Sequence, residues 1–187
     1  MDILEAFILL VVIMDPVVSI SALLSLSNGK ASDRMQTIKK AMIVAAVVFF
    51  LFAFGGEAVL GILGVSMNSF RAAGGILLII LGIQLSLGIF FHKMENVSES
   101  AVVIGTPLIS GPATIMTTMI LVKDIGLLGT LAAGIPALIV MLVSLLLASR
   151  ISRLVGRGSM DVLSTMMGIV TVAWGIQFLF MGVTGFF

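Results

Sequence analysis

Pro16 and Pro112, two of the four prolines of the chain, lie inside long apolar stretches, where they would interrupt helices. Asp15 precedes Pro16, and Gly111 precedes Pro112. Proline removes one backbone donor, clashes with the preceding turn of a helix, and disfavours α geometry at the residue before it. The pattern predicts a broken helix at each position, with freed carbonyl and amide groups that need protein, water or a ligand as partners.

Asp15 is the residue in these stretches with the clearest chemical meaning. A carboxylate in the centre of a membrane is costly, so it usually has a partner or carries a proton. One interpretation is a protonatable coupling site or a contact for a substrate ammonium group. The other is a carboxylate that caps the broken helix, and the two interpretations are compatible.

Two such breaks facing each other predict a small polar chamber. Half-helix N-termini favour a carboxylate, and freed carbonyls favour an ammonium group or a cation, so a zwitterionic amino acid with a small side chain fits both. The candidate substrate- or ion-binding residues at the breaks are Asp15, Pro16, Val18, Ser19, Ser110, Gly111, Pro112 and Thr114, with further hydroxyls at Ser21, Thr117 and Thr118.

Four other polar residues lie in apolar stretches. Gln84 and Gln177 either contact substrate or form hydrogen bonds between helices. Glu57 and Arg71 are expected near the outer face, where a structural or gating ion pair is favoured over a substrate site.

Several kinds of chemistry lack the residues they need. Cysteine is absent and there is one histidine, which excludes disulfides and leaves little for a metal site. We find no cluster of base, nucleophile or metal ligands, so we expect no catalytic residue, no metal and no cofactor. The net charge of +1 offers no basic patch for nucleic acid.

The composition fits a lipid bilayer. Of 187 residues, 60% are hydrophobic and 10% charged, with a mean hydropathy of +1.30. A membrane helix needs about 20 apolar residues. Six segments qualify, and they predict an all-α polytopic membrane protein with one transmembrane domain over residues 1–187. The segments are Ile3–Leu26, Ala41–Val65, Phe70–Phe91, Ala101–Val122, Ile125–Ala148 and Val162–Phe187.

Basic residues predict the orientation, because they favour the cytoplasmic side. The first, third and fifth connections share one side and hold eight of the ten Lys and Arg residues. We therefore expect both termini outside the cytoplasmic (inner) membrane, with Lys123 and Asp124 forming a tight fourth connection on the outer side. The eight residues are Lys30, Arg34, Lys39, Lys40, Lys93, Arg150, Arg153 and Arg157.

An internal repeat connects the two breaks. Pro112 follows Pro16 by 96 residues, and the Gly-Ile-Gln triplet at 82–84 recurs after 93 residues at 175–177. Three helices per half is an odd number, so the halves, about 1–92 and 101–187, would form a 3+3 inverted repeat, as in many secondary transporters. At 1.5 Å per residue, Asp15 lies ~18 Å along its helix. Both breaks are therefore expected near the midplane, and their repeated placement favours function over simple kinks.

The motifs resemble those of the MarC family, which belongs to the LysE-like exporter group. The resemblance rests on Asp15-Pro16, on FRAAGGILL at 70–78 and on TPLISGP at 106–112, and it covers essentially the whole chain. It implies six helices and transport of small neutral amino acids such as glycine, alanine and serine, coupled to an ion gradient. At four positions the family commonly has Gly, Asn, Pro and Gly, and this chain has other residues. These differences bear on substrate size rather than on the fold. The departing residues are Val18, Ser19, Ser21 and Ala113.

The leading hypothesis is a secondary transporter driven by H⁺ or Na⁺ through alternating access. An exporter or channel for another small solute is the alternative. A membrane enzyme would need the missing catalytic cluster, and an assembly protein would not explain paired breaks at the midplane. Lipid is the expected surrounding partner, and the sequence leaves a homo-oligomer open.

Overall fold

The computed structural model describes residues 1–26, 31–88 and 111–185, and this part of the chain consists of helices joined by short turns. No strand occurs within it, which confirms the predicted all-α class. The helices are α1 (Ile3–Met14), α2 (Pro16–Leu26), α3 (Ala31–Leu63), α4 (Met67–Ser86), α7 (Pro112–Leu146), α8 (Ala148–Val155) and α9 (Arg157–Thr184).

Five stretches of the described residues are long and apolar enough to cross a membrane. They are Ile3–Leu24, Arg34–Leu63, Met67–Ser86, Pro112–Leu146 and Gly158–Thr184. The predicted fourth and fifth segments meet within α7, and residues 101–110 of the fourth lie outside the described part of the chain. The structure therefore bears out five apolar spans, not the full set of six.

The turning point within α7 differs from the predicted one. Lys123 and Asp124 remain helical, and the non-helical residue is Gly126, with φ 76° and ψ 168°. The prediction of a connection at Lys123 and Asp124 is wrong on this point. A positive φ is readily adopted by glycine and avoided by residues with a Cβ atom, so the break falls on the glycine that follows the charged pair.

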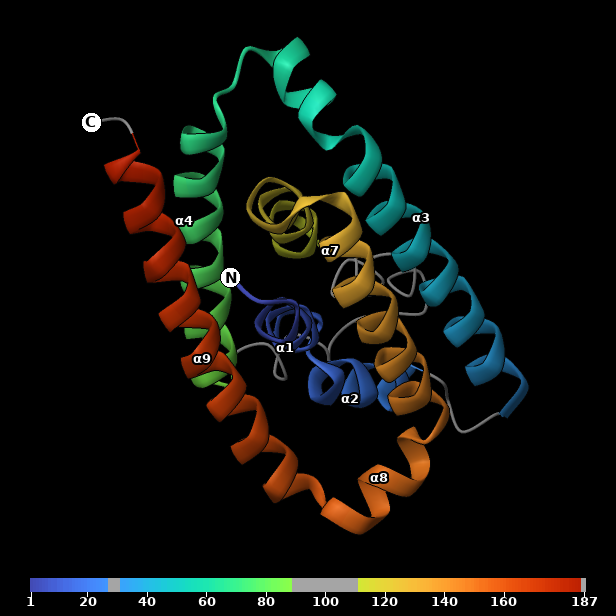
Figure 1. The fold of residues 1–187 in the computed structure, drawn as a ribbon. Coiled ribbons are helices and arrows are strands. Elements are labelled where there is room, and N and C mark those ends of the chain that lie inside the picture. Colours follow the sequence, from blue (N-terminus) through green and yellow to red (C-terminus); the bar gives the residue numbers. More distant parts are fainter. Residues whose placement is uncertain (27–30, 89–110, 186–187) are drawn as a thin grey trace.

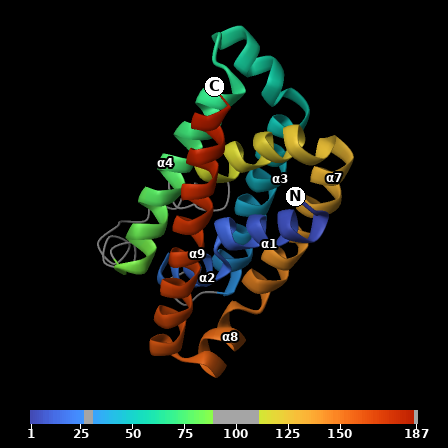
Figure 2. The ribbon, with the colours of Figure 1, turned by 60° about the vertical axis from the view of Figure 1, so that its left-hand side comes forward.

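The long helices form two pairs with shorter segments between them. Figure 1 shows α4 beside α9, and α3 beside the second half of α7. In the same view α1 and the first half of α7 are seen end-on, and Figure 2 shows both running across the long helices. The predicted position of Asp15 near the midplane assumed that its helix runs along the membrane normal. The observed α1 runs across the long helices instead, so that estimate of depth does not apply.

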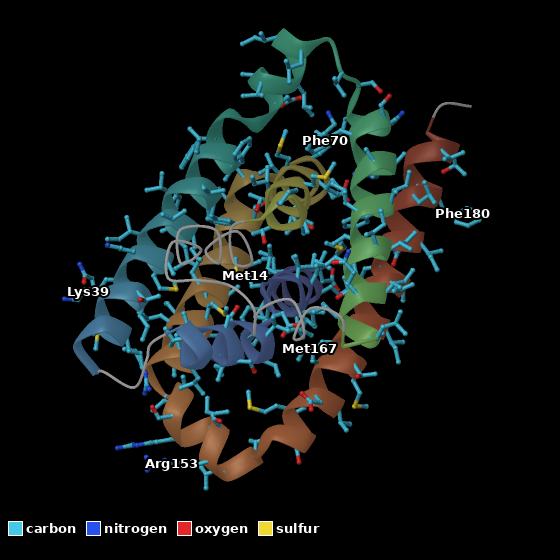
Figure 3. All side chains as sticks on the ribbon, turned by 180° about the vertical axis from the view of Figure 1, so that it is seen from behind. Met14, Lys39, Phe70, Arg153, Met167 and Phe180 are labelled. Carbon is cyan, nitrogen blue, oxygen red and sulfur yellow. The ribbon has the colours of Figure 1, made fainter. Side chains whose placement is uncertain are left out.

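The two ends of the bundle differ in charge. At one end, Arg34 at the start of α3 donates a hydrogen bond to Ser149 of α8. The first and fifth connections therefore lie at the same end, as predicted, and Arg153 marks this end in Figure 3. At the other end, Asn68 at the start of α4 donates to the carbonyl of Gly185 at the end of α9.

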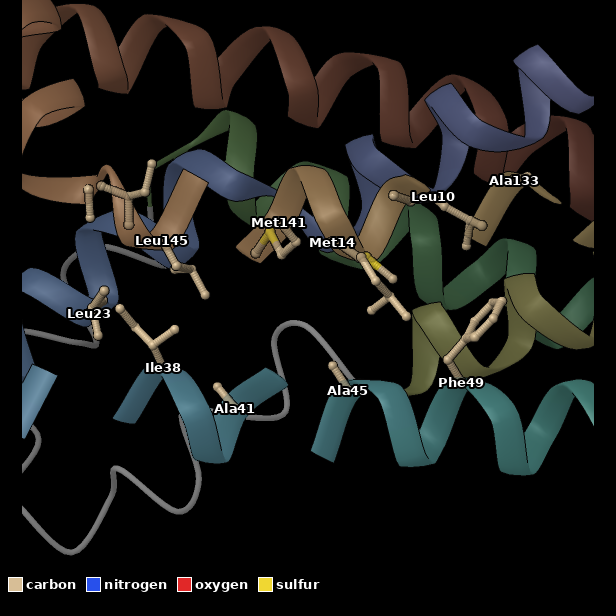
Figure 4. Close-up of a cluster of buried hydrophobic side chains, with 14 of the residues drawn as sticks. Leu10, Met14, Leu23, Ile38, Ala41, Ala45, Phe49, Ala133, Met141 and Leu145 are labelled. Atoms are coloured by element: carbon tan, nitrogen blue, oxygen red, sulfur yellow. The ribbon is translucent and has the colours of Figure 1, made fainter. Parts of the chain in front are cut away.

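Apolar packing joins α1 to α7 and, through one buried cluster, to α3. Leu10 and Met14 of α1 belong to one buried cluster with Phe49 of α3 and Met141 of α7 (Figure 4). The ring of Phe49 lies directly against Gly134, at a place where any side chain would collide with it. Apolar contacts thus fix α1 up to Met14, the residue before Asp15.

Glycines allow α4 and α9 to touch through their backbones. A Cβ atom at Gly82 would lie 2.5 Å from the carbonyl oxygen of Gly168 and 2.8 Å from the amide nitrogen of Val172. Small residues at such positions are the usual means of close helix packing in membranes. The pair therefore depends on the absence of a side chain.

We expect Gly82→Ala to destabilise the protein by about 1–3 kcal/mol, because the added methyl group would force the two backbones apart. Gly55→Ala in α3 is the matched control, since a Cβ atom there meets nothing within 4 Å. Thermal unfolding in detergent should show a lower Tm for Gly82→Ala and an unchanged or higher Tm for Gly55→Ala. Equal Tm values for the two variants would contradict this packing.

Candidate functional site at the helix break

Asp15 separates α1 from α2 in a left-handed backbone conformation. Its φ is 42° and its ψ is 84°, and it is the one non-glycine residue with positive φ among the described residues. Its amide donates to the carbonyl of Val12 at 3.2 Å, which closes the last turn of α1. The predicted break after Met14 is confirmed, although Asp15 takes the left-handed conformation rather than the extended one that proline favours in its predecessor.

The side chain of Asp15 caps the helix that follows. Its Oδ1 atom accepts hydrogen bonds from the amides of Val17 and Val18, both at 3.1 Å. The residue is 1% exposed, so water does not take this role. The carboxylate also lies at the positive end of the α2 dipole. The interpretation of Asp15 as a cap is therefore confirmed, and its role in binding stays a prediction.

The second carboxylate oxygen of Asp15 remains open. Oδ2 is buried and has no hydrogen-bond partner among the described residues. The hydroxyl of Ser19 donates to the carbonyl of Met14 at 3.2 Å, which satisfies one of the groups that the break frees. The break thus presents one buried acceptor to a proton, a cation or an ammonium group.

The N-terminal half of α7 lies alongside this break. Gly111 is its extended N-cap residue, with ψ 173°, and Pro112 is its first residue. Ile13 of α1 packs in one buried cluster with Ala113 and Ile120 of α7, so the residues adjoining Asp15 and Thr114 come together. The structure agrees with a helix start at the second proline, and Ser110 lies outside the described residues.

Two threonines on one face of α7 carry unpaired buried hydroxyls. The Oγ1 atoms of Thr114 and Thr117 have no hydrogen-bond partner among the described residues, and both side chains are buried. Thr118, by contrast, donates to the carbonyl of Thr114 at 2.8 Å. Thr117 was named only as a nearby hydroxyl from sequence, because the helical register that turns it inward was not known.

The two predicted glutamines differ in their surroundings. Gln84 is half-buried on α4, whereas Gln177 is exposed on α9. Gly175 and Phe178 occupy the buried side of α9, and helical periodicity turns Gln177 away from it. The structure does not bring Gln177 together with the buried carboxylate of Asp15.

The predicted ion pair between Glu57 and Arg71 is wrong. Arg71 pairs with Asp124, and Glu57 faces Lys123, with 3.9 Å between its Oε1 atom and the lysine Nζ atom. The adjacent opposite charges at 123 and 124 were the sequence signal for this arrangement, and their separate partners could not be assigned without the fold.

The physical reason is the position of α7 between α3 and α4. Met119 of α7 lies against Gly56 of α3, and Met116 lies against Gly74 of α4. The first half of α7 therefore separates the helices that carry Glu57 and Arg71.

These features define a helical integral membrane protein with a buried acidic helix break. The chain belongs to the MarC family, since the family described as "MarC family integral membrane protein" matches residues 1–187. The predicted resemblance is thereby confirmed over the whole chain.

Curated relatives extend over nearly the same length. UPF0056 membrane protein MJ0972 of Methanocaldococcus jannaschii is 34% identical, over 100% of this chain and 90% of the relative. UPF0056 membrane protein YhcE of Escherichia coli K12 is 26% identical, over 97% of this chain and 91% of the relative. No solved structure matches the chain.

We expect Asp15→Ala to lower the free energy of unfolding by about 1–2 kcal/mol, because it removes the cap and places alanine at a positive φ. Asp15→Asn should retain most of the stability, since asparagine keeps an acceptor oxygen and tolerates the left-handed conformation. Thermal and denaturant unfolding of both variants would measure the difference. Equal losses in the two variants would contradict the capping role.

Proposed function

We propose that this protein is a secondary transporter of small neutral amino acids, such as glycine, alanine and serine, across the cytoplasmic membrane. Transport is coupled to an H⁺ or Na⁺ gradient and proceeds by alternating access. No cofactor and no catalytic step are required. Membership of a family of integral membrane proteins supports the setting. The chemistry of the break suits a zwitterion with a small side chain, and the resemblance to the MarC family implies small neutral amino acids.

The observation that carries the proposal is the divided role of the Asp15 carboxylate. Oδ1 holds the start of α2, while Oδ2 is buried without a partner. A buried charge without a partner is costly, so this oxygen favours a proton or a cationic group. Binding and release of a coupling ion or a substrate ammonium group at Oδ2 would leave the cap intact.

The neutral groups nearby suit the rest of a small amino acid. The unpaired hydroxyls of Thr114 and Thr117 are donors for a carboxylate, and the start of α7 at Pro112 adds the positive end of a helix dipole. Apolar residues of the adjoining helices, such as Ile13 and Ala113, pack in one buried cluster, and such surroundings favour a ligand with a small apolar side chain.

The contacts between α4 and α9 support an inverted repeat. Gly75 and Gly82 recur as Gly168 and Gly175 at the same spacing of 93 residues. A Cβ atom at Gly75 would lie 2.5 Å from the carbonyl oxygen of Gly175, and one at Gly82 equally close to that of Gly168. A two-fold rotation that exchanges the halves converts one contact into the other, as in an isologous interface.

The buried faces of α4 and α9 are related by the same spacing of 93 residues. The buried positions of α4 at Gly75, Leu78, Gly82 and Leu85 correspond after 93 residues to buried positions of α9 at Gly168, Thr171, Gly175 and Phe178. Two halves related by an axis in the membrane plane can exchange conformations, which opens one shared site to each side in turn.

Charge supports the orientation in the membrane. Arg150 and Arg153 lie on α8, at the end where α3 begins with Arg34. Basic residues favour the cytoplasmic side, so we place this end in the cytoplasm and the C-terminus, which lies at the opposite end beside Asn68, outside. The predicted position of the N-terminus outside does not follow from this charge distribution, because α1 runs across the long helices (Figure 2).

Reconstitution into proteoliposomes tests the function directly. We expect saturable uptake of labelled alanine, with accumulation driven by an imposed proton or sodium gradient. Asp15→Asn, which retains the cap, should lose gradient-driven accumulation and keep alanine exchange. Asp161→Asn, which changes an exposed carboxylate at the start of α9, is the matched control and should behave as the unaltered protein.

Three results would count against the account. Absence of saturable uptake under either gradient would reject a transporter of this class. Flux that rises linearly with concentration would favour a channel. Full accumulation by the Asp15→Asn variant would remove Asp15 as the coupling residue.

A further inference from the structure

A second candidate site lies apart from the helix break, between α3, the start of α4 and the first half of α7. It is a cavity of about 300 Å³. The residues that line it are Phe52, Ala53, Phe54, Glu57, Met67, Met119, Val122 and Lys123. Six of these are apolar, and the other two carry opposite charges.

The two charged groups of this cavity are in loose contact. The Oε1 atom of Glu57 and the Nζ atom of Lys123 are 3.9 Å apart, which exceeds the usual hydrogen-bond distance. Their side chains are 77% and 57% exposed, so each can accept another partner. The neighbouring pair, Arg71 with Asp124, is closer and more deeply buried.

The apolar part of the cavity is firmly built. Met119 packs against Gly56 so closely that a Cβ atom on the glycine would lie 2.6 Å from the methionine Cγ atom. Met67 contributes from the first turn of α4. Methionine side chains adapt to small apolar groups of different shape. The surface beside the charges therefore suits a short aliphatic side chain.

We propose that this cavity is a vestibule that binds the zwitterion of a small neutral amino acid before it reaches the break at Asp15. Glu57 binds the ammonium group, and Lys123 binds the carboxylate. The inference rests on the proposed transport function and adds to it a first binding site with its own residues.

The charges discriminate between classes of ligand. One acid and one base match a zwitterion, whereas a dicarboxylate would meet repulsion from Glu57 and a diamine repulsion from Lys123. An exposed ion pair contributes little to stability, so a ligand can replace it at low cost. For the same reason, neutral substitutions of either residue should leave the protein folded.

Ligands that lack one charge separate the two roles. Binding of alanine, alaninamide and lactate to the full-length protein in detergent is measured by thermal shift over a concentration series. The variants are Glu57→Gln and Lys123→Gln. Their controls are Asp161→Asn and Lys39→Gln, which change exposed charges outside the cavity.

We expect each cavity variant to weaken alanine binding by about tenfold, the loss typical of one charge-assisted hydrogen bond. Lys123→Gln should leave alaninamide binding unchanged, because that ligand has no carboxylate. Glu57→Gln should weaken alaninamide binding and leave lactate binding unweakened. The controls should bind all three ligands as the unaltered protein does.

Equal binding of alanine by the unaltered protein and both cavity variants would overturn the vestibule and leave the transport function standing. An equal loss for all three ligands in both variants would also overturn it, because it would indicate a purely structural ion pair. Failure of the unaltered protein to bind or transport any neutral amino acid would reject the proposed function itself.

Discussion

The structure depends on how the polar backbone groups at one helix break find hydrogen-bond partners in apolar surroundings. Pro16 cannot donate its amide, and Asp15 leaves the helical conformation, so polar backbone groups are exposed where water is scarce. The Asp15 carboxylate accepts the amides of Val17 and Val18, and the hydroxyl of Ser19 donates to the carbonyl of Met14. The break is stable because residues within it supply these partners, and one carboxylate oxygen remains available.

The break lies within a closely packed set of helices. The α1 helix packs chiefly against α7, and α7 in turn separates α3 from α4. The paired glycines of α4 and α9 form a second close contact, between the backbones of these two helices. The charged residues at 57, 71, 123 and 124 join α3 and α4 to α7 at one end.

The local chemistry of single residues could be predicted from the sequence, whereas the directions of the helices and the partners of the charged residues could not. The Asp15-Pro16 pair predicted a break because proline lacks an amide donor and disfavours helical geometry in the residue before it. The basic residues predicted which connections share an end. Hydropathy measures length and not direction, so the transverse course of α1 was missed. The charges of Lys123 and Asp124 suggested a connection, but both residues remain helical and Gly126 takes the turn. The pairing of Glu57 required knowledge that α7 lies beside it.

The central claim is that the break at Asp15 is a substrate site reached in turn from both sides of the membrane. The chain has no cysteine, so Ser19→Cys introduces a single thiol beside the break. Ser19 is 5% exposed in the structure. In oriented vesicles, membrane-impermeant thiol reagents applied to either side should label this residue, and alanine should slow the reaction from both sides. Labelling from neither side, or labelling that alanine leaves unchanged, would contradict the account.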